Sequence, residues 1–387
     1  MSATANWSYP TNVRFGAGRI RELAEACRSI GLAKPLLVTD PGLSRLRMVT
    51  DAVAFCRAAG LDVAVFDEVQ ANPVDSNVAQ GVARYREGGH DGVIAFGGGS
   101  ALDCGKVIAF MAGQKRPLWD FEDIGDWWTR ADPHGIAPIV AVPTTAGTGS
   151  EVGRAGVITN QETHTKKVIF HPRMLPKIVV CDPELTLDLP AKVTAGTGMD
   201  ALAHCLEAYC ARGFHPMADG IAVEGIRLVK EFLPRAVANG HDIEARSAMM
   251  AAAAMGATAF QKGLGAIHAL SHPIGALHNT HHGMTNAVFM PYVLAFNREA
   301  IAPRMERLAA YLGLAAPSFD AVIAWVLELR REIGVPHTLE GLGLSGVDAD
   351  RIAAMAVVDP TASGNPVALS KEGALRVLDN ALTGKLD

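Results

Sequence analysis

Five histidines lie within fifteen residues of one apolar, glycine-punctuated stretch. The stretch is GLGAIHALSHPIGALHNTHHGMTN, and its histidines are His268, His272, His278, His281 and His282. Imidazole binds divalent metals and exchanges protons near neutral pH. A single buried histidine is usually a hydrogen-bonded core residue, but five in so short a stretch require a chemical explanation. His268 and His272 are four residues apart, which places them on one face of a helix.

A second pair of candidate ligands lies upstream, in TGMDALAHCLEAY. Asp200 and His204 are also four residues apart and share a helix face. Such a pair alone is often only hydrogen-bonded. Combined with histidines of the first stretch, it offers one carboxylate and two or three imidazoles, a set that suits Zn²⁺ or Fe²⁺ better than Mg²⁺ or Ca²⁺. The residues therefore indicate a divalent-metal site, with a merely polar helical core as the alternative.

A glycine-rich turn follows an apolar run in VIAFGGGSALDCGK. Gly97, Gly98, Gly99 and Ser100 come directly after a predicted strand and begin a predicted helix, and Asp103 completes the pattern GGGSxxD. Glycine permits close approach of the backbone, and a helix N-terminus offers unpaired N–H groups to an anion. The pattern departs from GxGxxG, so it predicts either a pyrophosphate-binding loop or a simple strand-to-helix turn.

A second loop, VPTTAGTGSEV, also leaves a predicted strand. Small residues separate its hydroxyl groups and let phosphate or ribose approach; the hydroxyls belong to Thr144, Thr145, Thr148 and Ser150. Asp40 ends the run LLVTD, where a carboxylate can bind the adenosine ribose and repel a 2′-phosphate, which favours NAD over NADP. In the ordinary dinucleotide fold the acid follows the glycines, whereas Asp40 precedes them. We interpret the loops as a variant dinucleotide site, and a strand-end cap is the alternative for Asp40.

The elements that must position these residues differ between the two parts of the chain. The first part alternates apolar β-rich runs with amphipathic helical stretches; we expect strands at 34–40, 62–69, 91–100, 137–145, 155–159 and 176–182. This alternation predicts a parallel sheet covered by helices. After about residue 185 the β signal stops, and we expect helices at 191–212, 217–238, 242–262, 264–278, 301–313, 317–334 and 348–358. The sequence thus predicts an α/β dinucleotide-binding domain over 1–185 and an all-α metal and substrate domain over 186–387.

Bulk properties exclude several classes of protein. A chain of 387 residues usually forms more than one core, consistent with two domains. The net charge of −5, without a basic run, argues against nucleic acid or an anionic membrane as partner. The apolar runs are too short to span a bilayer, and the N-terminal residues lack a signal-peptide pattern. Six cysteines without a CxxC spacing indicate reduced thiols, so we expect a cytoplasmic protein.

Six segments of the chain resemble the iron-containing (group III) alcohol dehydrogenases. They are FGGGSALDCGK, PTTAGTGSEV, DPELTLDLP, GMDALAHCLEAY, GLGAIHALSHPIGALHNTHHGMTNAV and SGNP. The resemblance runs nearly end to end and implies a Rossmann-like parallel-sheet domain with an all-α domain, the dehydroquinate synthase-like architecture. It also implies NAD(P), a divalent metal (Fe²⁺ favoured, Zn²⁺ as the alternative) and a homodimer or larger homo-oligomer.

The resemblance also assigns roles to residues. The family's metal ligands match Asp200, His204, His268 and His282. His272 matches a catalytic histidine beside the nicotinamide and the substrate. Lys166 matches a cofactor-contacting lysine, although Lys167 next to it leaves the register open. We expect His278 either to relay protons or to be structural, and His281 to be a surface or packing residue.

The implied activity is hydride transfer between a primary alcohol and the nicotinamide, with the metal as Lewis acid. Departures from the family's usual residues bear on the substrate: Gly153 and Ala155 predict a roomy pocket, and Thr361 stands where some relatives have cysteine. Strand alternation directs Arg154 away from that pocket. Lys262 is either the partner of a substrate carboxylate or a solvated helix lysine.

We therefore favour an ω-hydroxy acid such as 4-hydroxybutyrate as the small-molecule substrate. A general short-chain alcohol dehydrogenase and a diol- or lactaldehyde-type reductase are alternatives within the family. A metallohydrolase is the alternative from another class.

Overall fold

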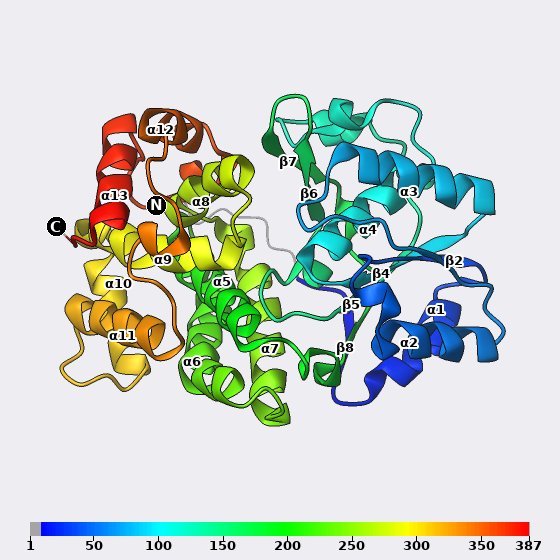
Figure 1. The fold of residues 1–387 in the computed structure, drawn as a ribbon, viewed down its shortest axis with the longest axis horizontal. Helices are drawn as coiled ribbons and strands as arrows, with labels where there is room; N and C mark the ends of the chain where they lie inside the picture. Colours follow the sequence, from blue (N-terminus) through cyan, green and yellow to red (C-terminus); the bar gives the residue numbers. More distant parts are fainter. Residues whose placement is uncertain (1–8, 387) are drawn as a thin grey trace. The chain divides into compact units, whose positions relative to one another are not determined.

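The computed structural model describes residues 9–386, which form two compact units (Figure 1). The first unit contains Tyr9–Thr145 and Gly149–Leu187. The second contains the short segment Ala146–Thr148 and the chain from Asp188 onward. The predicted fold class, a parallel-sheet region followed by an all-helical region, is confirmed. None of the helices in residues 9–386 is both long enough and apolar enough to cross a membrane.

The first unit is built on a six-stranded parallel sheet. Its strands, in spatial order, are β1 (Asn12–Phe15), β8 (Ile178–Cys181), β5 (Ile139–Pro143), β4 (Gly92–Gly97), β2 (Pro35–Val38) and β3 (Ala64–Phe66). Every residue of the four inner strands is buried, as expected for a sheet covered on both faces. Parallel pairing brings the carboxyl ends of neighbouring strands to the same edge, so the loops that follow β2, β4 and β5 are neighbours.

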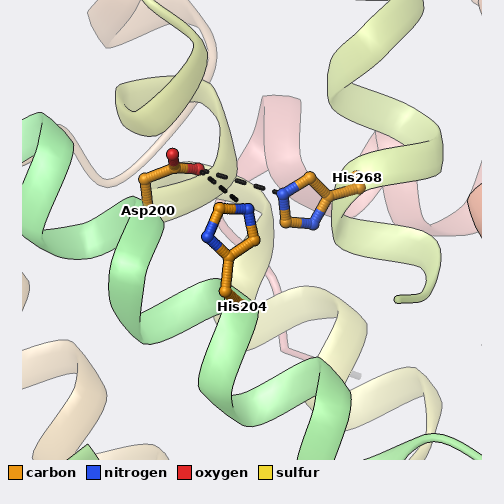
Figure 2. A group of neighbouring side chains, drawn as sticks. All are labelled: Asp200, His204 and His268. Carbon is orange, nitrogen blue, oxygen red and sulfur yellow. Dashed lines mark ion pairs between the residues drawn. The ribbon is translucent and has the colours of Figure 1, made fainter. Parts of the chain in front are cut away.

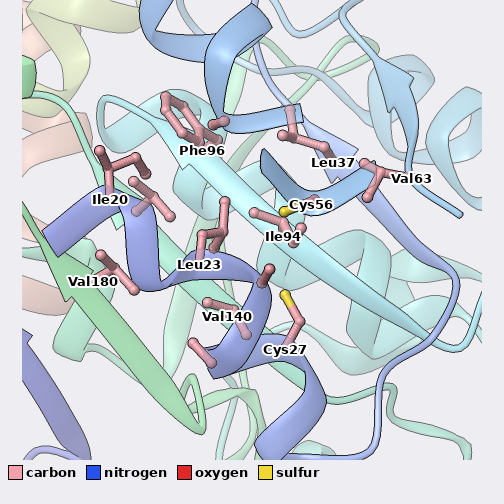
Figure 3. Packing of buried hydrophobic residues seen from close by; sticks show 14 of the residues in the cluster. Ile20, Leu23, Cys27, Leu37, Cys56, Val63, Ile94, Phe96, Val140 and Val180 are labelled. Carbon is pink, nitrogen blue, oxygen red and sulfur yellow. The ribbon is translucent and has the colours of Figure 1, made fainter. Parts of the chain in front are cut away.

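Helices cover both faces of this sheet. Alternate strand residues such as Ile94 and Val140 pack against α1 (Leu23–Ser29) and α2 (Arg47–Ala58) in one apolar core (Figure 3). The opposite face is covered by α4 (Gly99–Met111), and α3 (Asp75–Gly88) packs on α4. Gly105 permits this close packing, because a Cβ there would lie 2.8 Å from the Cβ of Ala95.

One predicted strand does not join the parallel sheet. The run at 155–159 is a strand, β6 (Ala155–Asn160), but it pairs with β7 (Thr165–Phe170) in a separate antiparallel hairpin. Neither β7 nor β1 was predicted from the sequence. Both are short and carry exposed or half-buried charged residues, so neither presents the unbroken apolar run that predicts a buried strand.

The second unit is helical. Its helices are α5 (Ala191–Cys210), α6 (Pro216–Ala238), α7 (Ile243–Ala259), α8 (Ala266–His278), α9 (His282–Phe296), α10 (Arg298–Tyr311), α11 (Phe319–Glu332), α12 (Ala349–Val357) and α13 (Lys371–Thr383). Helix α5 packs against α6, α7 and α9 and is buried along most of its length. Small residues make this possible: a Cβ at Gly198 would lie 2.2 Å from Leu233 of α6.

Helices α9 and α13 were not predicted from the sequence. Helix α9 is buried on every side over most of its length and contains Pro291, so its sequence lacks the amphipathic period that predicts a helix. This omission matters, because α9 begins at His282, one of the candidate ligands.

Candidate metal centre and nucleotide loops

One face of helix α5 carries three buried polar residues. Asp200, His204 and Glu207 follow one another at spacings of four and three, which aligns them along the helix. Their exposed fractions are 3%, 5% and 6%, so each needs a polar partner inside the protein. Helices α8 and α9 supply those partners.

The carboxylate of Asp200 faces the rings of His204 and His268 (Figure 2). Its Oδ1 atom lies 4.0 Å from Nε2 of His204, 3.9 Å from Nε2 of His268 and 3.6 Å from Nε2 of His282. The ligand atoms of Asp200, His204 and His268 all lie within 4.8 Å of one another. The rings of His204 and His268 are stacked, with centroids 4.8 Å apart. Residues from three helices therefore present one oxygen and three Nε2 nitrogens to the same point.

Glu207 fixes the orientation of the His268 ring. Its Oε2 atom lies 2.6 Å from Nδ1 of His268, and its Oε1 accepts the backbone N–H of Ile267 at 2.7 Å. An ionised carboxylate only accepts hydrogen bonds, so Nδ1 of His268 carries the proton. In the neutral imidazole, Nε2 then carries a lone pair on the side of the ring that faces the carboxylate of Asp200.

Asn286 of α9 is the polar neighbour that the cluster shares. Its Nδ2 donates to Oδ1 of Asp200 at 2.7 Å and lies 3.2 Å from Nε2 of both His268 and His282. An amide nitrogen has two hydrogens, whereas three potential acceptor atoms surround this one. Among residues 9–386, none donates a hydrogen bond to the buried Oδ1 atom of Asn286. Acceptors thus outnumber donors at the centre of the cluster.

The protonation of the cluster follows from its burial. Burial lowers the pKa of His204 to about 4, so this imidazole is neutral at physiological pH, as a metal ligand must be. Burial also opposes the charged form of His268, but Glu207 and Asp200 outweigh it and hold the pKa of His268 above its usual value. A divalent cation would replace the proton that these carboxylates attract. The donor set, one carboxylate and three imidazoles, fits Fe²⁺ or Zn²⁺.

His272 lies beside the cluster in a carboxylate network of its own. Its Nδ1 is 2.9 Å from Oδ2 of Asp359, and its ring stacks on His282 with centroids 5.4 Å apart. The other oxygen of Asp359 accepts the hydroxyl of Thr361 at 2.6 Å and its N–H at 2.9 Å. Burial raises the pKa of Asp359, but His272 and Thr361 more than compensate and hold it below its usual value. Thr361 therefore reaches the site through Asp359.

The remaining two histidines of the stretch lie at helix ends. His278 is the last residue of α8 and is exposed, and none of the described contacts of the cluster involves it. His281 precedes α9 and accepts the N–H of Met284 at its ring nitrogen, which caps the helix. His281 is therefore the N-cap of α9, a role that the sequence did not indicate.

The first unit brings the predicted nucleotide-binding segments together. Pairing of β2 with β4 sets Val38 opposite Ala95, so Asp40 lies beside Gly97 although the two are far apart in sequence. Oδ1 of Asp40 accepts the N–H groups of Gly42 and Leu43, both at 2.9 Å. These two bonds are those of a strand-end cap, the alternative role of Asp40. Its Oδ2 lies 3.9 Å from the position of a Cβ on Gly97. Gly97 has a φ of 144°, a conformation that favours glycine.

The two loops touch where β4 and β5 end. Thr144 donates its N–H to the carbonyl of Gly97 at 3.0 Å, and a Cβ on Gly98 would lie 3.3 Å from the Thr145 side chain. Helix α4 begins at Gly99, and its N-cap residue Gly98 has no side chain to bond the first N–H groups. Ser100 bonds the carbonyl of Ala71.

Asp103 and Lys106 tie the second loop to α4. Asp103 accepts the hydroxyl of Ser150 with one oxygen and the N–H of Val157 with the other. The buried ammonium of Lys106 donates to the carbonyls of Ser150 and Ala155. One oxygen of Asp103 therefore holds the second loop, and the other holds β6. Thr148 belongs to the segment 146–148, which clusters with the helical unit.

The hairpin separates the two adjacent lysines. Lys167 donates to Glu122 at 2.6 Å and lies over the ring of Trp119. Lys166 lies opposite Thr159 in the hairpin, on the other face from Lys167. Of the two neighbours, Lys167 is thus the one held by an ion pair with Glu122.

Strand alternation was expected to direct the side chains at positions 153 to 155, but only position 155 lies in a strand. β6 begins at Ala155, so Gly153 lies before the strand. A Cβ on Gly153 would lie 3.6 Å from Nζ of Lys106. The guanidinium of Arg154 lies over the ring of Phe170, with 5.4 Å between them.

Lys262 is neither solvated nor part of a regular helix surface. It ends a short 3-10 turn, Phe260–Lys262, and its side chain is only 1% exposed. Its ammonium binds the carboxylate of Asp219 and the carbonyl of Tyr209 at 3.1 Å. Arg304 contacts the other oxygen of Asp219 at 3.2 Å. The interpretation of Lys262 as a solvated helix lysine is therefore wrong.

Three site residues were missed by the sequence analysis: Glu207, Asn286 and Asp359. Glu207 could have been found, because it continues the face that carries Asp200 and His204. Asn286 follows His282 by four residues, but α9 itself was not predicted. Asp359 is 87 residues from His272, and no sequence spacing connects them.

Comparisons with known proteins agree with this architecture. Residues 10–183 match the family described as iron-containing alcohol dehydrogenase, and residues 194–382 match the C-terminal part of the Fe-containing alcohol dehydrogenase family. A 4-hydroxybutyrate dehydrogenase from Cupriavidus necator is 41% identical over 384 residues, covering 97% of this chain and 99% of that protein.

Solved structures are similar over the whole chain. A 1,3-propanediol oxidoreductase matches with a TM-score of 0.93 at 37% identity, covering 98% of this chain and all of that one. A sulfoacetaldehyde reductase from Bifidobacterium kashiwanohense, solved in complex with NAD⁺, matches with a TM-score of 0.90 at 29% identity, covering 99% and 100%.

A parallel sheet with glycine and threonine loops at its strand ends, followed by helices around a carboxylate–histidine cluster, is typical of metal-dependent dehydrogenases. The chain belongs to the iron-containing alcohol dehydrogenase family. It is therefore an oxidoreductase, and the predicted resemblance is confirmed.

Proposed function

We propose that this protein is a metal-dependent, NAD(H)-linked dehydrogenase that interconverts an ω-hydroxy acid, such as 4-hydroxybutyrate, with its aldehyde, succinic semialdehyde. The observation that carries the metal chemistry is the convergence of three histidine Nε2 atoms on the Asp200 carboxylate. The relative named 4-hydroxybutyrate dehydrogenase supports the substrate. In this proposal residues 1–185 bind the dinucleotide, and residues 186–387 bind the metal and the substrate.

Asp200, His204, His268 and His282 hold the divalent metal, with Fe²⁺ favoured over Zn²⁺. The family's description as iron-containing supports Fe²⁺. When bound, the metal supplies a Lewis acid to the substrate oxygen, and the nicotinamide supplies the hydride acceptor or donor.

The residues of the chain orient the reactants and move the proton. His272 has its Nδ1–H held by Asp359, so its Nε2 accepts the proton that leaves the alcohol. We assign the later transfer of the proton to water to His278, which is exposed at the end of α8. Residues of the two strand-end loops and the hairpin bind the cofactor: Gly97, Gly98, Gly99, Ser100, Thr144, Thr145, Thr148, Ser150 and Lys166. Asp40 accepts from the adenosine ribose with its Oδ2 and thereby favours NAD over NADP. Asp103 supports Ser150.

The proposed substrate contacts are Lys262, Gly153, Ala155 and Thr361. Lys262 binds the substrate carboxylate by exchanging Asp219 for it. Arg304 stays paired with Asp219 when Lys262 leaves, so the carboxylate of Asp219 keeps a cationic partner. Gly153 and Ala155 leave room for a longer chain, and Thr361 acts through Asp359.

Two alternatives differ in substrate or class. A short-chain alcohol dehydrogenase or a diol- or lactaldehyde-type reductase would use the same centre, and the structural similarity to 1,3-propanediol oxidoreductase favours this reading. A metallohydrolase would use the cluster without a dinucleotide, so a test of NADH binding distinguishes it. We further propose a cytoplasmic location, which the six buried free cysteines support, and a homodimer or larger assembly.

The decisive assay compares two aldehydes with Fe²⁺-reconstituted protein under anaerobic conditions. NADH oxidation is followed with succinic semialdehyde and with pentanal, which is uncharged and of similar length. We expect kcat/KM to be at least tenfold higher for the acid. Equal values, or a preference for pentanal, would contradict the ω-hydroxy acid and leave a general alcohol dehydrogenase.

A further inference from the structure

Helix α8 begins without a cap from its own segment. Gly265 occupies the N-cap position and has no side chain to bond the first N–H groups. Two distant side chains take over this function: Asn365 accepts the N–H of Ala266 at 3.1 Å, and Glu207 accepts the N–H of Ile267 at 2.7 Å. Unpaired N–H groups at a buried helix start are costly, so these contacts fix where α8 begins.

The glycines of the GLG and SGNP motifs make this arrangement possible. A Cβ on Gly265 would lie 2.8 Å from Oδ1 of Asn365 and 3.0 Å from Oε1 of Glu207. A Cβ on Gly364 would lie 2.1 Å from the carbonyl oxygen of Leu264. Both motifs therefore bring the backbone close enough for Glu207 and Asn365 to reach the start of α8.

Glu207 makes a second contact that has no capping function. While Oε1 binds Ile267, Oε2 binds Nδ1 of His268 at 2.6 Å. Both oxygens of a carboxylate can accept, so one side chain fixes the helix start and the ring of the next residue together. The side chain of Glu207 is only 5% exposed, so water does not compete with these bonds.

We infer that Glu207 is the positioning residue of the metal centre: it holds the proton on Nδ1 of His268 so that Nε2 is the ligand atom, and thereby sets the affinity for the metal. The inference rests on the proposed metal centre and concerns a residue outside its ligand set. Carboxylates that orient a ligating histidine in this way change metal affinity about 10- to 100-fold when mutated.

Glu207→Gln tests the inference with little change in volume. The N–H of Ile267 can only donate, so it takes the glutamine oxygen and leaves the NH₂ group facing His268. Nδ1 of His268 must then accept, which places the ring proton on Nε2, the atom meant for the metal. The cap of α8 is kept and the ligand is blocked, so metal affinity falls while folding is largely preserved.

The control is Asp359→Asn, which makes the same change beside His272, a histidine outside the proposed ligand set. Zn²⁺ alone is titrated into each metal-stripped full-length protein against a chromophoric chelator at pH 7.5. We expect Glu207→Gln to bind Zn²⁺ about 10- to 100-fold more weakly than wild type. Asp359→Asn should weaken Zn²⁺ binding less than Glu207→Gln, since the hydrogen bonds described for Asp359 go to His272 and Thr361 and to none of the proposed ligands.

The outcomes separate this inference from the proposed function. Wild-type affinity in Glu207→Gln would overturn the positioning role and leave the dehydrogenase proposal intact. Absence of stoichiometric Zn²⁺ binding by the wild type would overturn both. If Glu207→Gln does not fold, a crystal structure of zinc-loaded wild type decides: ligation through Nε2 with Nδ1 on Glu207 supports the role, whereas ligation through Nδ1 or by Glu207 itself overturns it.

Discussion

Nδ1 of His272 lies 2.9 Å from Oδ2 of Asp359, a residue 87 positions further along the chain. The contact joins α8 to the turn after α12, and the hydroxyl of Thr361 bonds the same carboxylate. It gives His272, which lies beside the carboxylate–histidine cluster, a fixed ring orientation and a defined tautomer. The same chemistry, a carboxylate on Nδ1, occurs one helical turn earlier between Glu207 and His268.

Asp359→Asn should reduce turnover without weakening metal binding. The amide cannot compensate a proton gained by His272, so we expect kcat to fall roughly 10- to 100-fold, within the usual range for a positioned acid or base. KM for the aldehyde should change less than threefold. Steady-state kinetics of the metal-loaded variant measure both constants. A fall in kcat/KM that comes entirely from KM would contradict the proposed role of His272.

Removal of one proposed ligand should abolish metal binding. His204→Ala leaves two imidazoles and the carboxylate, and we expect at least a 100-fold loss of Zn²⁺ affinity together with loss of NADH oxidation. His281→Ala is the matched control, because His281 caps α9 at the edge of the same stretch. Metal content after dialysis, measured by atomic emission, reports the result; equal metal in the two variants would argue against the ligand set.

Lys262→Met should lower the preference for acid substrates. If Lys262 binds the substrate carboxylate, kcat/KM for succinic semialdehyde should fall about tenfold or more, in line with about 1.5–3 kcal/mol for a hydrogen bond to a charged group. The value for pentanal should be nearly unchanged. Lys167→Met is the control, since Lys167 is also ion-paired but lies in the hairpin. An unchanged ratio of the two substrates would assign Lys262 to packing against Asp219.

Glu151 should make the stability of the wild type depend on pH. Burial raises its pKa to about 7, so the folded protein keeps this proton over a pH range in which the unfolded chain loses it. Stability therefore falls as pH rises from about 4.5 to 7, by up to about 1.4 kcal/mol per pH unit.

Glu151→Gln removes this contribution. Relative to wild type, the variant should gain roughly 2–3 kcal/mol in its free energy of unfolding between pH 5 and pH 8. Urea unfolding of both proteins across this range measures the difference. A constant difference would mean that Glu151 keeps its usual pKa in the folded state, compensated by Lys106 nearby.

The sequence by itself determined much of the fold and part of the site. Apolar runs alternating with amphipathic stretches predicted the parallel sheet and its helices, because burial on both faces requires such runs. The spacings between Asp200 and His204 and between His268 and His272 predicted shared helix faces, since the helical period is local. The glycine and threonine loops could also be recognised, because each is a short local pattern in the sequence.

Only the tertiary structure decided which distant residues meet. Asn286 reaches Asp200 and Asp359 reaches His272 because of how the helical unit packs, and Asp40 meets Gly97 because β2 pairs with β4. A buried helix such as α9 leaves no periodic pattern, so His282 could not be placed on it from sequence. Long-range hydrogen bonds depend on the positions of whole elements, and local spacing does not contain that information.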